Sequence, residues 1–124
     1  NRRSNNQRRL HRIAEIKQNI PLPEVTGEGE KALISWGSHK YIARAVAESL
    51  KLVHIHFNHL WPLPEGLEKL LASYKQLITI ENNETHQLAR LLRQETGIRI
   101  HLQLGEDSGR PLDTLQLIEQ IKNG

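Results

Sequence analysis

The feature that most limits the fold of this chain is a regular alternation of strand-like and helix-like segments beyond residue 31. Short runs of apolar or β-branched residues predict strands. After each comes a segment with apolar residues three or four positions apart, which predicts a helix. The expected strands are 32–36, 52–57, 76–80 and 98–104, and the expected helices are 41–50, 64–74, 85–96 and a last one from Pro111. Strands that are each followed by a helix predict a mostly parallel sheet with helices on both faces and right-handed crossovers.

The first thirty residues differ from the rest in pattern and in charge. Leu10, Ile13, Ile16 and Ile20 predict a helix that Pro21 ends, and residues 21–31 are rich in the proline and glycine typical of a linker. Residues 1–20 carry six basic side chains against one acidic, a net +5, while the remainder carries eleven against thirteen, a net −2. We therefore expect residues 1–30 to be a basic helix and linker from a preceding domain, and residues 31–124 to be the α/β domain.

The chain lacks two residue types altogether. It has no cysteine, which excludes disulfides, a thiolate nucleophile, a cysteine zinc site and protein-ligated iron–sulfur clusters within these residues. It has no methionine, even at its start, so we expect a piece of a longer polypeptide. No apolar run approaches the ~20 residues that a bilayer span needs.

Ligands and partners of a parallel sheet meet the carboxyl ends of its strands. The polar, glycine-bearing and tryptophan-bearing stretches of this sequence follow the expected strand ends, so they should lie along one edge of the sheet. The candidate interface or anion-contact residues are Gly37, Ser38, His59, Trp61, Glu81, Asn82, Asn83, His86, Gln87, Gly109 and Arg110.

Most of these residues also have a purely structural interpretation. Gly37 and Ser38 suit a tight turn and a helix cap, and no nucleotide-binding glycine pattern accompanies them. Glu81 and the two asparagines after it suit the capping of a helix start. Arg110 is able to clamp a carboxylate or phosphate, but it is equally able to pair with the acidic residues just before it or to lie in solvent.

His54 and His56 should point to the same side of a strand, with His59 just beyond. Zinc accepts neutral imidazoles, but it usually takes a third or fourth ligand. No cysteine is present and the nearest carboxylates belong to other elements. The pattern therefore favours structural histidines over a metal site.

Five stretches occur together in one order: Ile20–Glu24 (Ile-Pro-Leu-Pro-Glu), Ile34–Ser38, His56–Pro64, Glu81–Ile98 and Gly109–Pro111. As a set they resemble the C-terminal region of the α subunit of 2-oxoacid:ferredoxin oxidoreductases, more the 2-oxoglutarate or general 2-oxoacid type than a complete pyruvate enzyme. The resemblance covers nearly the whole chain.

The resemblance implies a transketolase C-terminal-like, three-layer α/β/α fold of four or five strands, the fifth being antiparallel and not located by the sequence. It also implies membership of a cytoplasmic, multisubunit enzyme that decarboxylates a 2-oxoacid on thiamine diphosphate and Mg²⁺. Such an enzyme passes electrons through iron–sulfur clusters to ferredoxin and forms an acyl-CoA. The expected partners are the rest of the α subunit, the β subunit and, for the complete enzyme, ferredoxin.

The resemblance places no catalytic, cofactor-binding or metal-binding residue in these 124 residues. The Gly-Asp-Gly that marks the diphosphate site of such enzymes is absent, so we expect this piece to brace the assembly and to be inactive by itself. The family pattern Thr-Gly-Gln-Leu reads Thr85-His86-Gln87-Leu88 here, and an imidazole blocks the close approach that glycine allows.

Two other functions remain open from the sequence. One is an independent α/β module that binds an anionic metabolite through Gly37, Ser38 and Arg110. The other is weak nucleic-acid binding through the arginine-rich first helix, although aromatic residues make up only 4% of the chain and offer little surface for base stacking.

Overall fold

The computed structural model describes residues 8, 9, 12, 19–60, 63–81, 87–105 and 113–123. Ten elements lie in these residues. They are β1 (Glu24–Thr26), β2 (Lys31–Trp36), the short 3-10 helix η1 (Gly37–His39), α2 (Lys40–Leu50), β3 (Val53–Phe57), α3 (Leu67–Ala72), β4 (Gln76–Glu81), α4 (Gln87–Thr96), β5 (Leu102–Gly105) and α5 (Thr114–Asn123).

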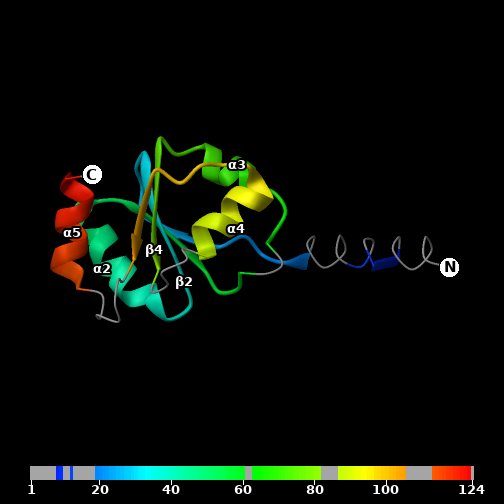
Figure 1. Ribbon diagram of the computed structural model, residues 1–124, viewed down its shortest axis with the longest axis horizontal. Coiled ribbons are helices and arrows are strands. Elements are labelled where there is room, and N and C mark those ends of the chain that lie inside the picture. The colour runs from blue at the N-terminus through cyan, green and yellow to red at the C-terminus, as the bar shows by residue number, and fades with distance from the viewer. Residues whose placement is uncertain are drawn as a thin grey trace.

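The strands form one five-stranded sheet in the order β1-β3-β2-β4-β5. Strands β2 to β5 are parallel to their neighbours, and β1 runs antiparallel along the outer edge of β3. Helices α2 and α5 cover one face of the sheet, and α3 and α4 cover the other (Figure 1). The predicted three-layer α/β/α fold with a mostly parallel sheet is confirmed.

The fifth, antiparallel strand is β1, which lies within the segment expected to be a linker. All three of its residues are exposed, so it carries no apolar alternation that could distinguish it from a linker. Its pairing with β3, with Val25 opposite Ile55, makes it a strand. The sheet therefore starts before residue 31.

Two other boundaries differ from the expectation. Strand β5 starts at Leu102 rather than at residue 98, because Ile98 and Ile100 pack into the core from an irregular segment that follows Gly97. Helix α3 begins only at Leu67, because the preceding Gly66 adopts a left-handed conformation (φ 81°). The helix expected over residues 10–20 lies mainly outside the described residues. So do the expected starts of two later helices, at residue 85 and at Pro111.

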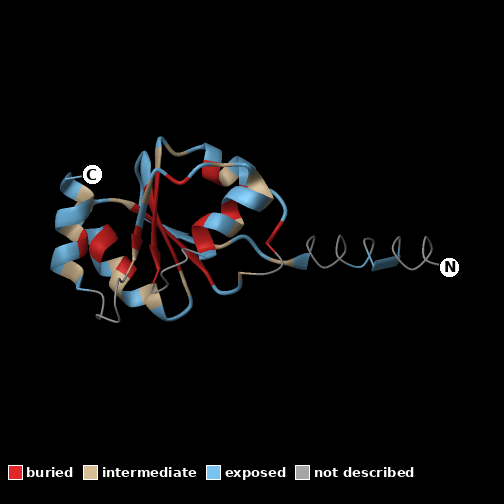
Figure 2. Ribbon diagram, in the orientation of Figure 1, coloured by how far each residue is buried: buried red, intermediate tan, exposed pale blue. Residues whose placement is uncertain are grey.

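Both faces of the sheet are buried (Figure 2). The face toward α3 and α4 has thirteen buried apolar residues: Ala32, Ile34, Val53, Ile55, Phe57, Leu63, Leu67, Leu71, Leu77, Leu88, Ala89, Leu92 and Ile100. The face toward α2 and α5 has eight: Leu33, Ala43, Val46, Ala47, Ile78, Ile80, Leu104 and Leu117. Within the described residues, none of the helices has the length and apolar content needed to cross a bilayer.

Candidate functional site

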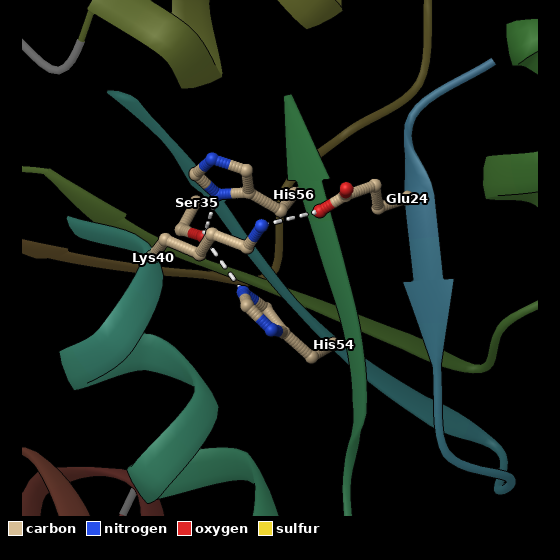
Figure 3. A network of polar contacts seen from close by, with 5 residues as sticks. All are labelled: Glu24, Ser35, Lys40, His54 and His56. Atoms are coloured by element: carbon tan, nitrogen blue, oxygen red, sulfur yellow. Dashed lines mark hydrogen bonds and ion pairs between the residues drawn. The ribbon is translucent and has the colours of Figure 1, made fainter. Parts of the chain in front are cut away.

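The main polar feature inside the domain is a three-residue network on the face of the sheet toward α2. Ser35 Oγ lies 2.8 Å from His54 Nε2 and 2.8 Å from His56 Nδ1 (Figure 3). The parallel register of β2 and β3 sets Ser35 opposite His56, and His54 lies two residues earlier on the same face. All three side chains are almost completely removed from solvent.

The hydrogen bonds of this network assign its protons. A serine hydroxyl has one proton, so Ser35 donates to one ring nitrogen and accepts from the other. His54 Nδ1 is buried and has no hydrogen-bond partner in the described part of the chain. An unpaired buried N–H costs more than an unused nitrogen lone pair, so we assign the proton of His54 to Nε2, which donates to Ser35. Ser35 then donates to His56 Nδ1.

Both imidazoles are held neutral by their surroundings. Burial lowers the pKa of His54 from 6.5 to about 4, with a further contribution from neighbouring His56. Burial also lowers the pKa of His56, and Lys40 adds to that effect. Lys40 Nζ lies 3.0 Å from a carboxylate oxygen of Glu24 on β1, and this contact lowers the pKa of the Glu24 carboxyl (Figure 3).

The network is a structural core rather than a reactive centre. Ser35 is fully buried, and its hydroxyl is engaged by both histidines. No group of three histidine, cysteine or carboxylate side chains that could hold a metal ion occurs among the described residues. The serine–histidine network joins β2 to β3, and the separate Lys40–Glu24 ion pair joins α2 to β1.

A second buried polar group, apart from the serine–histidine network, is Glu81 at the carboxyl end of β4. Its Oε1 accepts a hydrogen bond from Leu88 N–H at 2.6 Å, and its Oε2 accepts one from Ala89 N–H at 3.3 Å. These are orphan donors in the first turn of α4. The interpretation of Glu81 as a capping residue is confirmed.

The capping interpretation of Ser38 is wrong. The residue before α2 is His39, and no side chain makes a capping hydrogen bond there. Gly37 does take a left-handed turn (φ 61°), so the turn geometry is as expected.

The remaining candidates are only partly placed. Gly37, Ser38, His59 and Gln87 are exposed and, like Glu81, they lie at or beyond the carboxyl ends of β2, β3 and β4, which are neighbours in the sheet. Trp61, Asn82, Asn83, His86, Gly109 and Arg110 lie outside the described residues. An interface or anion-contact role for any of the eleven stays a prediction.

The sequence reasoning missed several residues that the structure singles out. Ser35 was not connected with His54 and His56, although their alternation in adjacent strands was a usable signal. Nothing in the sequence pairs Glu24 with Lys40, because that contact depends on β1 joining the sheet. Tyr41 and Leu115 are large apolar residues with 79% and 76% of their surface exposed.

No family model matches the chain. Similar proteins are nevertheless found. The α subunit of 2-oxoacid:ferredoxin oxidoreductase 2 from Aeropyrum pernix is 30% identical over an alignment of 129 residues, which covers 93% of this chain. The KorA subunit of 2-oxoglutarate oxidoreductase from Mycobacterium tuberculosis is 33% identical over 79 residues, or 60% of this chain. The chain spans only 20% and 12% of the length of these relatives.

Solved structures with the same fold come from the same group of proteins. A 2-oxoglutarate:ferredoxin oxidoreductase from Magnetococcus marinus matches 90% of this chain with a TM-score of 0.69 and 26% identity, over 20% of its own chain. The α chain of a probable 2-oxoacid ferredoxin oxidoreductase from Thermoplasma acidophilum matches 82% of this chain and 95% of its own, with a TM-score of 0.52 and 25% identity. This chain is thus a homologue, over most of its length, of a part of the α subunits of 2-oxoacid:ferredoxin oxidoreductases.

Proposed function

We propose that this chain is the C-terminal structural and assembly domain of such an α subunit. The complete enzyme would oxidatively decarboxylate a 2-oxoacid, 2-oxoglutarate in our proposal, to an acyl-CoA in the cytoplasm and would reduce ferredoxin. The structure of the Magnetococcus marinus relative was solved with 2-oxoglutarate, coenzyme A and succinyl-CoA bound, which supports that substrate class. The residues that precede β1 would connect this domain to the preceding part of the subunit.

The residues of this chain do not match the donor sets of the cofactors that the complete enzyme would use. Iron–sulfur clusters are typically held by cysteine thiolates, and the sequence contains no cysteine. The Gly-Asp-Gly that marks the thiamine diphosphate site of such enzymes is absent from the sequence. We assign both cofactors to other parts of the enzyme.

The observation that carries the assembly role is the exposure of Tyr41 and Leu115. Each is the second residue of a helix that follows a parallel strand, so both lie toward the carboxyl edge of the sheet, on the same face. Helices α2 and α5 pack against each other (Figure 1). Contiguous exposed apolar patches commonly mark contact surfaces, and we propose that Tyr41 and Leu115 belong to one such patch.

The occupant that we propose for this surface is the remainder of the α subunit. The similarity covers about a fifth of the relatives' length, so the larger part of such a subunit is available to cover it. The β subunit would then contact the assembled α subunit, with the carboxyl-edge residues Gly37, Ser38, His59 and Gln87 as candidates.

The test is to co-express this chain, tagged, with the remainder of the α subunit and the β subunit, and to identify retained proteins by mass. We expect the remainder of the α subunit to be retained. A Tyr41→Ser/Leu115→Ser variant should lose most of it. The matched control is Leu22→Ser/Val25→Ser, which removes one exposed apolar residue just before β1 and one within it, and which should retain the remainder of the α subunit. Equal retention by both variants, or none by the folded wild-type chain, would contradict the proposal.

A further inference from the structure

We propose that a hollow beside β5 is a binding site for a phosphate group. This hollow is lined by other residues than the assembly surface, and its phosphate binding does not depend on the proposed function. It rests on three donors brought together by the turn between α4 and β5: the guanidinium groups of Arg93 and Arg99 and the imidazole of His101.

The hollow has a volume of about 310 Å³ and lies between the end of α4 and the start of β5. Its lining consists of Ala89, Arg93, Arg99, Ile100, His101, Leu102 and Gln103. Helix α4 ends at Thr96. The N–H of the next residue, Gly97, donates to the carbonyl of Arg93 at 2.8 Å, and its positive φ (75°) turns the chain. That reversal is why Arg99 returns to the same hollow as Arg93.

His101 makes two hydrogen bonds to the backbone of Leu77 on β4, one through its own backbone and one through its side chain. Its N–H donates to the carbonyl of Leu77 at 2.9 Å, and its Nδ1 accepts from the N–H of Leu77 at 3.0 Å. Because Nδ1 acts as an acceptor, the neutral ring carries its proton on Nε2. The imidazole therefore offers a donor of fixed orientation in the lining of the hollow.

The charge of the lining has one sign. Arg93 and Arg99 are exposed, no carboxylate lines the hollow, and neither guanidinium forms an ion pair with another residue of the described part. Glu95, two residues after Arg93, lies instead in the lining of a separate hollow with Glu65 and Glu68. No acidic residue of the described lining therefore supplies the negative charge that the two arginines attract.

This donor set fits a phosphate group. Guanidinium groups bind phosphate oxygens through paired, charge-assisted hydrogen bonds, and two of them together match a doubly charged phosphate better than a single carboxylate. His101 Nε2–H and the Gln103 amide add neutral donors. The phosphate is either inorganic phosphate or the phosphomonoester of a small organic molecule, because the hollow is open to solvent on the outer edge of the sheet.

The experiment is a ¹H–¹⁵N NMR titration of the full chain with inorganic phosphate and, separately, with glycerol 3-phosphate, with sodium chloride at matched ionic strength as the reference. We expect saturable shifts of the amides of Arg93, Arg99 and His101 that chloride does not reproduce. Tighter binding of inorganic phosphate would identify the free ion as the ligand, and tighter binding of glycerol 3-phosphate would identify an organic phosphomonoester.

Variants separate a built site from general attraction to positive charge. Arg93→Gln and Arg99→Gln should each raise the Kd about tenfold, because each removes paired charge-assisted hydrogen bonds. His101→Asn keeps an acceptor for Leu77 N–H but removes the outer donor, and it should raise the Kd by a smaller factor. The matched control is Arg90→Gln, which removes an exposed charge one turn earlier on α4, outside the lining, and should leave the Kd within about twofold.

Three results would overturn the proposal. The first is a linear, non-saturating response to both phosphates. The second is an equal loss of binding in Arg90→Gln and Arg93→Gln, which would show unspecific attraction. The third is saturable binding of a glutamate-rich peptide without binding of either phosphate, which would assign the surface to an acidic protein segment.

Discussion

The two faces of the central sheet are both buried, but by different chemistry, and β3 shows the difference within five residues. Val53, Ile55 and Phe57 point into the apolar cluster under α3 and α4. His54 and His56 point to the other face, where they share the hydroxyl of Ser35 under α2. All five residues of β3 are buried.

This difference teaches that alternation of apolar and polar residues does not always mean one buried and one solvated face. On the α3/α4 face, stability comes from apolar area and close packing, which do not depend on pH. On the α2/α5 face, part of the interior is a hydrogen-bonded network of titratable groups. The contribution of the α2/α5 face to stability should therefore fall at low pH, and that of the α3/α4 face should fall when a cavity is made in it.

The largest expected effect is a cavity in the apolar face. Phe57 is 2% exposed and is among the largest fully buried side chains. Phe57→Ala should lower the free energy of unfolding by about 3–5 kcal/mol, because transfer and cavity contributions add. Urea denaturation at pH 7.5 and at pH 5 should give the same loss at both values.

The loss expected for Phe57→Ala is close to the whole free energy of unfolding of a marginally stable domain, so this variant could fail to fold. Phe57→Leu serves as the milder variant. It should give a smaller loss that is again equal at the two pH values. A larger loss at pH 5 than at pH 7.5 would contradict the contrast between the two faces. It would mean that the stability of the apolar face also depends on the titration of neighbouring groups.

The second prediction concerns the polar face and depends on pH. His54 has an ordinary pKa of 6.5 and a folded-state pKa of about 4. Above pH 6.5 the imidazole is neutral in both states, so the full stability is present. As the pH falls from 6.5 toward 4, His54 becomes protonated in the unfolded chain but stays mostly neutral in the folded chain. The free energy of unfolding therefore falls by up to about 3 kcal/mol.

The charged neighbours that act on His54 are His56, Arg44, Lys40 and Glu24; of these only Glu24 raises its pKa. Urea denaturation in steps from pH 7.5 to pH 4 measures the effect. His54→Gln should remove most of this slope, and the matched variant of exposed His59, His59→Gln, should leave it unchanged. If His54→Gln and the wild-type chain lose stability in parallel, His54 is not the pH-sensitive group.

The parts of the fold that the sequence predicted are those with strong apolar periodicity. β2, β3, β4, α2 and most of α4 appear where the pattern placed them, because their residues pack into the two clusters. β1 was missed because its residues are exposed and its pairing partner is 30 residues away. The start of β5 was misplaced because Ile100 is buried without belonging to the ladder.

The site was predicted less well, for a related reason. The capping role of Glu81 follows from local sequence, since a carboxylate just before a helix meets its free N–H groups. The contacts of Ser35 with the two histidines join residues 19 and 21 positions apart, and they require the register of two strands. Local patterns do not contain that register.

The smallest of the expected effects tests Glu81, the one carboxylate that is buried on the α3/α4 side among the described residues. The Glu81 carboxylate accepts both the Leu88 and the Ala89 N–H, and an amide keeps only one acceptor oxygen. Glu81→Gln should therefore lower the free energy of unfolding by about 1–3 kcal/mol, from one unpaired N–H and the lost charge at the helix start.

The effect of Glu81→Gln should also be local, unlike that of a cavity under the sheet. Amide hydrogen exchange should accelerate at Leu88 and Ala89 more than at residues of β3, while Gln87→Ala, at the exposed first residue of α4, should change neither exchange nor stability appreciably. Uniform acceleration across both faces would show that Glu81 supports the whole sheet rather than one helix. The apolar face would then depend on a buried charge as directly as the polar face depends on its histidines, and the contrast between the two faces would fail.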